Sequence, residues 1–280
     1  MNTEAYESLI NELLCQSGRT DGRDGSWFEQ MACTILVKIG ITSFSSLYFI
    51  PGSSRFTNKF WDISSLAALS RSIVESYCAL RYIAVDSPGQ EERFFRQSLW
   101  QFQMESEKLR MLEATVPDSL GIPGVRAKRD TFRAKVQTNT FFQSLSDKHQ
   151  ARLLEGKESM SKSKFDLCSN AGINKDLSRG IYKYLSSFTH ASPFGLRALY
   201  DHKAGSDATI VIVNLMANLT SGFLAFTIRD FAEVFPDQKE HMPKSIVDQI
   251  QKWQGIFAWD FSGAGKIINE QRNPLHPAAG

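Results

Sequence analysis

The chain has 280 residues, of which 42% are hydrophobic and 22% are charged, and such a chain can bury a large core. Disordered, collagen-like and mini-protein classes are therefore excluded. Lys and Arg number 32 against 30 Asp and Glu, which leaves a formal net charge of +2. The overall charge thus predicts neither a nucleic-acid nor a membrane partner, and any such partner has to be argued from a local patch.

Apolar residues recur at helical spacing along most of the chain, and alternation of the strand type is hard to find. The sequence therefore predicts an all-α multi-helix bundle. Low-order stretches at Ser17–Ser26 and after Phe261 predict mobile connections, and Gly121–Gly124 predicts a loop. The expected helices are residues 3–15, 27–49, 61–85, 90–115, 131–145, 148–155, 164–170, 176–188, 208–234 and 243–257.

Positive charge is concentrated in the middle of the chain. From Arg126 to Lys164 there are ten Lys and Arg against four Asp and Glu, so this region carries +6 and the remainder carries −4. The region is also the poorest in apolar residues, which predicts a basic excursion of short helices at about 121–170. We expect it to project from a single helical domain over 1–260, followed by a flexible tail at 261–280.

The same region is a candidate nucleic-acid surface, because clustered cations beside Phe132 and Phe141 can hold phosphates and stack bases. A solvated helical face explains the charges equally well. The candidate nucleic-acid-binding residues are Arg126, Lys128, Arg129, Arg133 and Lys135.

The amino-terminal segment has no basic region, uninterrupted apolar run or cleavage site of an export signal, which predicts a cytoplasmic protein. Residues 208–228 carry no charge over a length close to a bilayer span. Asn214 and Asn218 share one face of this segment, and no Lys/Arg cluster flanks it. These features favour a central bundle helix over a membrane span. The four cysteines lie far apart in the sequence and are expected to be reduced core residues.

Arg71 and Glu75 are the only charges between Asp62 and Arg81, and their spacing of four places them on one helix face. Small residues around this helix allow close packing, so both side chains are expected to be partly buried. One interpretation is an internal ion pair that fixes helix register. In the other, Arg71 presents its planar donors to a phosphate or carboxylate and Glu75 orients it.

Tyr182, Ser186 and His190 recur at spacings of four, ahead of the helix-stopping Pro193. His190 is expected either to cap the helix end or to act as a general acid/base facing Arg71 or Glu75, with its ring oriented by Ser186 or Tyr182.

Arg197 and His202 form an R-x4-H pair that suits metal-independent RNA cleavage, in which arginine holds the phosphate and histidine moves a proton. Two unrelated surface residues would show the same spacing.

No motif for a metal or cofactor is complete. The segment from Ser262 to Lys266 resembles the end of a phosphate loop, but Asp260 stands at the position of the required early glycine. Zinc-site spacings, nucleophile elbows and paired acidic signatures are absent from the sequence. We therefore expect no cofactor and no metal.

The segments R-S-I-V-E-S-Y-C-A-L-R-Y-I and Y-K-Y-L-S-S-F-T-H resemble a large bacterial helical family of unknown function. Members of that family show an R-x3-E helix and, about a hundred residues later, Y-x2-L-S-x3-H. The corresponding positions here are Arg71, Glu75, Tyr182, Leu185, Ser186 and His190. The resemblance covers about a third of the chain, and the basic middle and the tail lie outside it.

That family is similar to the HEPN (higher eukaryotes and prokaryotes nucleotide-binding) bundles, many of which are RNases or inactive RNA-binding modules in toxin–antitoxin and phage-defence systems. The resemblance implies a HEPN-like core with a nucleotide or RNA site. This chain has Ala198 after Arg197, where active HEPN members usually carry a polar residue. The departure counts against cleavage and leaves nucleotide binding open.

Three hypotheses follow. The leading one is an RNA- or nucleotide-directed protein of bacterial defence or stress response, in its enzymatic form a metal-independent endoribonuclease. Its candidate catalytic residues are Arg71, Glu75, Ser186, His190, Arg197 and His202. The second is a non-enzymatic interaction module with a buried Arg–Glu/His cluster, which binds a protein partner or a second copy of itself. The third is a membrane-associated effector that uses the 208–228 helix.

Overall fold

The computed structural model describes residues 3–51, 61–86, 88–190, 192–201 and 203–259. Twelve α-helices, with no β-strand, make up the regular structure of these residues together with three short helical turns, which confirms the all-α multi-helix class. The α-helices are α1 (Thr3–Thr20), α2 (Trp27–Ser46), α3 (Ile63–Leu80), α4 (Gln90–Thr115), α5 (Ile122–Thr138), α6 (Thr140–Gln143), α7 (Asp147–Leu154), α8 (Lys164–Asn170), α9 (Lys175–Thr189), α10 (Pro193–Asp201), α11 (Asp207–Val234) and α12 (Lys244–Ala258).

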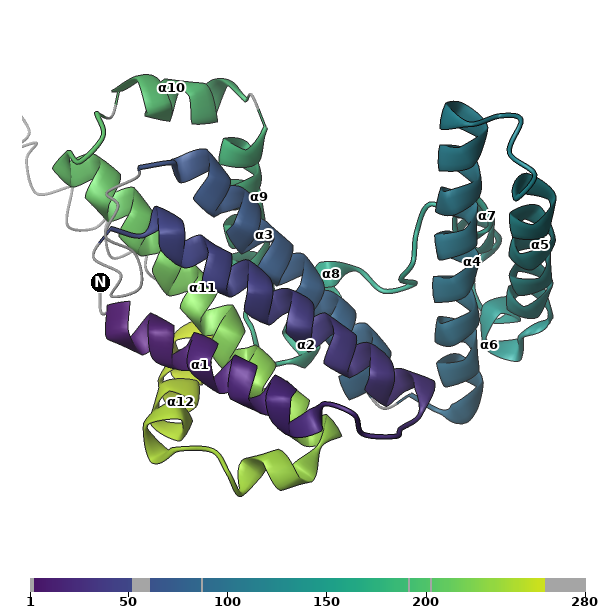
Figure 1. Ribbon diagram of the computed structural model, residues 1–280, viewed down its shortest axis with the longest axis horizontal. Coiled ribbons are helices and arrows are strands. Elements are labelled where there is room, and N and C mark those ends of the chain that lie inside the picture. The colour runs from purple at the N-terminus through teal and green to yellow at the C-terminus, as the bar shows by residue number, and fades with distance from the viewer. Residues whose placement is uncertain (1–2, 52–60, 87, 191, 202, 260–280) are drawn as a thin grey trace, which may run out of the picture.

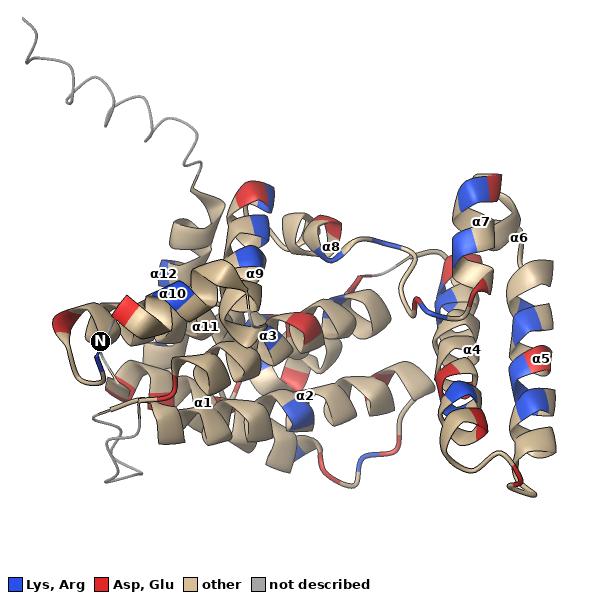
Figure 2. Cartoon of the chain, turned by 90° about the horizontal axis from the view of Figure 1, so that it is seen from above, with Lys and Arg blue, Asp and Glu red and all other residues tan. Residues whose placement is uncertain are grey.

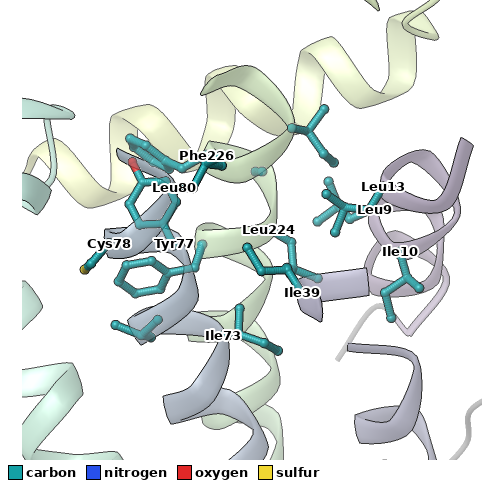
Figure 3. Packing of buried hydrophobic residues seen from close by; sticks show 14 of the residues in the cluster. Leu9, Ile10, Leu13, Ile39, Ile73, Tyr77, Cys78, Leu80, Leu224 and Phe226 are labelled. Atoms are coloured by element: carbon teal, nitrogen blue, oxygen red, sulfur yellow. The ribbon is translucent and has the colours of Figure 1, made fainter. Parts of the chain in front are cut away.

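The main bundle is built around α3 and α11, which pack against each other, with α1, α2, α9 and α12 around them (Figure 1). Its core is continuous from the first helix to the last. Figure 3 shows Leu9 and Leu13 of α1 and Tyr77 of α3 packed near Leu224 and Phe226 of α11. Burial of this apolar surface is the main favourable term in folding the bundle.

Helix α11 is the longest helix among the described residues. Every residue from Thr220 to Ile228 is buried, whereas Val211 and Leu215 in its first half are exposed. By length and composition alone, Trp27–Phe49 and Asp207–Val234 could each cross a membrane. Of the apolar 18-residue stretch in each of these helices, 44% and 61%, respectively, is buried inside the bundle. Core helices of soluble proteins pass the same test, so the composition of these two helices does not assign a compartment.

A buried charge cluster joins α3 to α11. Asp230, which is 1% exposed, accepts a 2.9 Å hydrogen bond from the hydroxyl of Tyr77 and forms ion pairs with Arg81 and Arg229. Burial raises the pKa of the Tyr77 phenol well above its ordinary value, and the adjacent Asp230 carboxylate raises it further. Because each charge here is paired, the cluster fixes the register of two core helices.

Helix α4 stands beside the main bundle, with α5 and α6 packed on its far side and α7 next to it (Figure 1). We call α4 to α7 the side hairpin. It has apolar clusters of its own, separate from the main core. One consists of Phe95, Leu99, Phe102, Val136, Phe142 and Leu153, and the other of Leu109, Ile122 and Val125. The basic region contains two short helices of the expected kind, α6 and α7, together with a longer one, α5, of 17 residues, and these three helices pack with α4.

The predicted loop at Gly121–Gly124 was wrong, because α5 begins at Ile122 with Pro123 and Gly124 in its first turn. Proline is compatible with a first turn, where the backbone N–H has no helical partner in any case. Burial of Ile122 and Val125 against Leu109 offsets the weak helix propensity of Gly124.

The prediction of a mobile connection at Ser17–Ser26 was partly wrong, since α1 continues to Thr20. Gln16 and Thr20 are buried, and the Thr20 hydroxyl donates to the Gln16 carbonyl. The single helix expected at 131–145 is interrupted at Asn139, whose side chain accepts hydrogen bonds from the backbone of α6 and so caps its start. The tail at 261–280 lies outside the described residues.

Helix α10 was not predicted. Pro193 both follows the end of α9 and opens α10, and the Ser192 hydroxyl accepts a hydrogen bond from the backbone of Gly195. A proline that stops one helix can start the next, because its fixed φ suits a first turn.

All four cysteines are free thiols. The expectation of core cysteines holds for Cys78 and Cys168, which are buried with their sulfur atoms 3.8 Å apart. It was wrong for Cys15, which is exposed, and Cys33 is half-buried.

Candidate functional site

The candidate site lies where α3, the start of α8 and the end of α9 meet. Each helix start is fixed by a capping side chain: Asp62 for α3, Ser163 for α8 and Asn174 for α9. These caps determine where the polar residues of each helix fall. The residues brought together, which we call the polar cluster, are Arg71, Glu75, Lys164, Tyr182 and His190.

The Tyr182 hydroxyl is the centre of the polar cluster. It donates a 2.7 Å hydrogen bond to Oε1 of Glu75 and accepts 2.8 Å hydrogen bonds from Nη2 of Arg71 and Nζ of Lys164. One donor and two acceptor sites are all that a phenol offers, so its hydrogen-bonding capacity is filled. Both cations also lie over its ring, with Lys164 Nζ 4.1 Å and Arg71 Cζ 5.0 Å from the ring centroid.

His190 closes the polar cluster on its solvent side. Nη1 of Arg71 lies 2.8 Å from Nε2 of His190, and because a guanidinium can only donate, Nε2 must accept with its lone pair. His190 caps the end of α9 and is exposed, whereas the Arg71 side chain is 22% exposed. The Arg71–His190 contact therefore forms a rim that a ligand from solvent can reach.

Glu75 carries the negative charge of the polar cluster. Burial raises the pKa of its carboxyl, but hydrogen bonds from Tyr182 and Lys164 and the charges of Lys164 and Arg71 outweigh it and lower the pKa from its ordinary value. For Lys164, burial lowers the pKa, and the bonds to Tyr182 and Glu75 outweigh it and raise the pKa. Both groups therefore stay charged at neutral pH.

The structure brings together three of the predicted site residues: Arg71, Glu75 and His190. The expectation that Arg71 and Glu75 are partly buried on one face is confirmed, because their side chains are 22% and 40% exposed and form an ion pair of 3.3 Å. Ser186 takes no part in the polar cluster, because its hydroxyl donates to the backbone carbonyl of Tyr182 in its own helix. The ring of His190 contacts Arg71, and among the described residues no side-chain hydrogen bond joins this ring to Ser186 or Tyr182, the two residues expected to orient it.

Arg197 lies apart from the polar cluster. It is 73% exposed in α10, where it pairs with Asp201 at 2.6 Å and lies over the ring of Tyr200. His202, the other half of the R-x4-H pair, lies outside the described residues. The R-x4-H hypothesis therefore has no geometry to support it.

The five predicted nucleic-acid-binding residues lie in α5, on the outer side of the side hairpin (Figure 2). Arg126 pairs with Glu113 of α4, and Arg129 pairs with its neighbour Asp130. Lys135 lies 5.3 Å from the ring centroid of Phe132. Lys128 and Arg133 are exposed. These side chains form a solvent-facing basic surface in the part of the side hairpin that faces away from the main bundle.

Two members of the polar cluster were missing from the predicted catalytic set. Tyr182 was noted in the helical stripe but was not assigned a catalytic role. Lys164 was counted only as part of the basic region, although the helix that begins there was predicted with its observed bounds. A cation at a helix start after a polar stretch is too common a pattern to single out a site.

No group of three or more His, Cys, Asp or Glu in the described part of the chain is placed to hold a metal ion. What the polar cluster offers instead is a planar cation beside an imidazole at its rim. An arginine suits the equatorial oxygens of a phosphate, and an imidazole can take or give a proton.

A family model described as a family of unknown function, DUF5677, matches residues 58–207, more than half of the chain. The chain belongs to this family. The DUF5677 region contains all five residues of the polar cluster and every helix from α3 to α10. The predicted membership of an uncharacterised helical family is confirmed, but the basic middle of the chain lies inside the match and not outside it as expected. No curated protein and no solved structure matches the chain.

Proposed function

We propose that this protein is a cytoplasmic, HEPN-like helical bundle that acts on RNA or a nucleotide through the rim of its polar cluster, in bacterial defence or stress response. The observation that carries the proposal is the 2.8 Å contact between Arg71 and the exposed His190. These two side chains are 119 residues apart in the chain, and the fold joins them at the surface.

The contact supplies the two groups that phosphodiester transfer needs without a metal. A phosphate oxygen at the rim would replace Nε2 of His190 as the acceptor for Arg71, which leaves the imidazole lone pair free. His190 then takes the proton of the ribose 2′-hydroxyl while the 2′-oxygen bonds to phosphorus. The bond from phosphorus to the 5′-oxygen breaks, and the imidazolium returns the proton to that oxygen. The products are a 2′,3′-cyclic phosphate and a 5′-hydroxyl.

Incubation of the purified chain with a defined single-stranded RNA in EDTA tests this function. We expect cleavage by the wild type and a loss of about 100-fold or more in His190→Ala, the usual contribution of a positioned acid or base. Arg71→Lys keeps the charge but lacks the bidentate fork, and should also be slow. His241→Ala removes another exposed histidine, outside the polar cluster, and should cleave normally.

Arg197→Ala separates the two candidate pairs. If Arg197 and His202 form the true site, this variant loses cleavage and His190→Ala keeps it. If no RNA is cleaved, or if cleavage is unchanged in both His190→Ala and Arg71→Lys, the enzymatic function is wrong.

A second candidate is an interaction module in which the polar cluster is structural. The mutual hydrogen bonding of Arg71, Glu75, Lys164 and Tyr182 favours it, since such a network locks three helices without any ligand. Thermal denaturation discriminates the two. A structural role predicts that His190→Ala and Arg71→Lys lower the melting temperature, whereas a catalytic role predicts lost cleavage with little change in stability.

A further inference from the structure

A pocket of about 450 Å³ lies between the main bundle and the side hairpin. Its lining comes from α2, α3, α4, the connection from α7 to α8, and the first residue of α8. Such a volume falls within the range of about 300–1,000 Å³ that is usual for small-molecule sites. Glu75 and Lys164 belong both to this pocket and to the polar cluster, so the pocket adjoins the proposed reaction site.

The pocket has an aromatic and sulfur-rich part. Trp100 of α4 contributes its indole, which is half-buried and packs against the main core, and Met31 and Met160 lie in the same lining. A planar ring can stack on an indole face, and thioethers make favourable contacts with aromatic rings. The pocket therefore suits a flat aromatic group such as a nucleobase.

The pocket also has a cation available for an anionic group. Lys38 of α2 is exposed, and no ion pair involves it among the residues that the structure describes. Lys164, in contrast, is engaged by Glu75 at 3.0 Å. The side-chain hydroxyls of Ser76 and Ser159 and the Glu75 carboxylate add polar groups that can pair with base edges or a ribose.

A second pocket of about 400 Å³ continues from the first, and the two share Ser159, Met160 and Lys164. Its lining adds Arg152, Lys157 and Lys162, so with Lys164 it has four cations against the single carboxylate of Glu158. Three partly exposed ion pairs hold these added cations, and such pairs are weak enough for a phosphate to compete with. Together the two pockets form a path with an aromatic site at one end and positive charge along the other.

We propose that the first pocket binds one nucleotide of a single-stranded RNA, with the base on Trp100 and its phosphate at Lys38, and that the RNA backbone continues over the second pocket. The inference rests on the proposed function and names how the substrate is held. The positive second pocket favours a polynucleotide over a free nucleotide. A nucleotide in the first pocket lies beside Glu75, one helical turn along α3 from Arg71, which places a neighbouring phosphate near the reactive rim.

Binding is measured separately from cleavage, in the His190→Ala background, by fluorescence anisotropy of a labelled ten-nucleotide oligo(A). We expect Lys38→Ala to weaken binding about tenfold and to reduce the slope of log affinity against log salt by about one. Trp100→Ala should weaken binding at least about tenfold, the scale of one lost stacking partner, and Trp100→Phe should retain most of it. Ala79→Phe, which places a ring in the first pocket without removing a contact of the core, should block binding.

Lys244→Ala is the matched control, because Lys244 is an exposed lysine at the start of α12, which lies away from the side hairpin (Figure 1). It should bind as its parent does. Adenosine monophosphate is added as a competitor. If adenosine monophosphate displaces the oligo(A) at micromolar concentration, the natural ligand is a free nucleotide. If it does not, while the oligo(A) binds tightly, the natural ligand is RNA.

Each outcome decides the inference. If the oligo(A) does not bind, or if it binds equally to the Lys38→Ala, Trp100→Ala and Ala79→Phe variants, the pocket is not the nucleotide site. In either case the cleavage assay with wild-type chain and Arg71→Lys still decides the proposed function. If the wild-type chain cleaves RNA and the Lys38→Ala, Trp100→Ala and Ala79→Phe variants bind oligo(A) normally, the pocket inference is wrong and the proposed function stands.

Discussion

At the scale of single residues, the Tyr182 hydroxyl has the most connections in the site. It bonds Glu75, Arg71 and Lys164 at once, so removing one oxygen atom leaves two cations and a carboxylate without their common partner. Charged groups make the stronger hydrogen bonds in proteins, and their loss is felt more than that of neutral pairs.

Tyr182→Phe should therefore lower the free energy of unfolding by about 1–2 kcal/mol, the scale of hydrogen bonds to charged groups at a partly exposed site. Urea denaturation measures the change. Tyr184→Phe is the control in the same helix, since the ring of Tyr184 packs against Phe188 but no hydrogen bond involves its hydroxyl in the described structure. Equal losses in the two variants would show that the ring, and not the hydroxyl, carries the effect.

The residues of the site were predictable only where a single helix carries the pattern. Arg71 and Glu75 share a face at a spacing of four, and Tyr182 and His190 share another, so both sets were visible in the sequence. That the two sets face each other depends on the packing of α3 against α9, which no local pattern encodes. Lys164 was missed for the same reason, because its role exists only through contacts with α3 and α9.

At the scale of elements, the packing of α12 on α11 depends on the absence of one side chain. Gly222 lies in the buried half of α11, and an added Cβ would meet the ring of Phe257 in α12 at less than contact distance. Glycine normally weakens a helix interior by about 1 kcal/mol relative to alanine. Here the close approach of the ring reverses that preference.

Gly222→Ala should therefore destabilise the protein by about 1–3 kcal/mol, the usual cost of overpacking a core. Gly255→Ala in α12 is the matched control, because a Cβ at that position meets nothing, and it should stabilise by about 0.5–1 kcal/mol. Melting temperatures of the two variants should move in opposite directions. A stabilised Gly222→Ala would show that Phe257 does not seat against α11.

Element boundaries show where sequence patterns succeed and fail. The bounds of α4 and α8 agree with prediction. In both helices the apolar residues follow helical spacing, and turn-forming residues stand on either side of that pattern. Prediction failed for α5 and α10, which begin with prolines at or near the first position. From sequence alone, a proline or glycine at the start of a segment predicts a loop. In α5 the tertiary contacts of Ile122 and Val125 make this segment a helix, and these contacts cannot be read from the sequence.

At the scale of the whole molecule, the side hairpin has its own apolar clusters, and Trp100 is among the few side chains of α4 that reach the main core. The separation could not be predicted, because the charge pattern marks the basic region but does not show that α4, ahead of it, belongs with it. Regions with separate cores often open independently.

Phe142→Ala should remove about 3–5 kcal/mol from the side hairpin, as is usual for a buried phenylalanine. We expect hydrogen exchange to lose protection in α4 to α7 while α3 and α11 keep theirs. Phe94→Ala, which removes an exposed ring of α4, should change neither. An equal loss of protection everywhere would instead support one cooperative domain over residues 1–260.

The buried contact between Tyr77 and Asp230 bears on the order in which the chain folds. These residues are 153 positions apart, so α3 leaves the ribosome long before α11 is available to cover it. The contacts of α4 with α5 and α6 are local by comparison, and local contacts form early because they close short loops. The side hairpin can thus complete its own contacts before α11 is synthesised, and the core around α11 is among the last parts of the molecule to form.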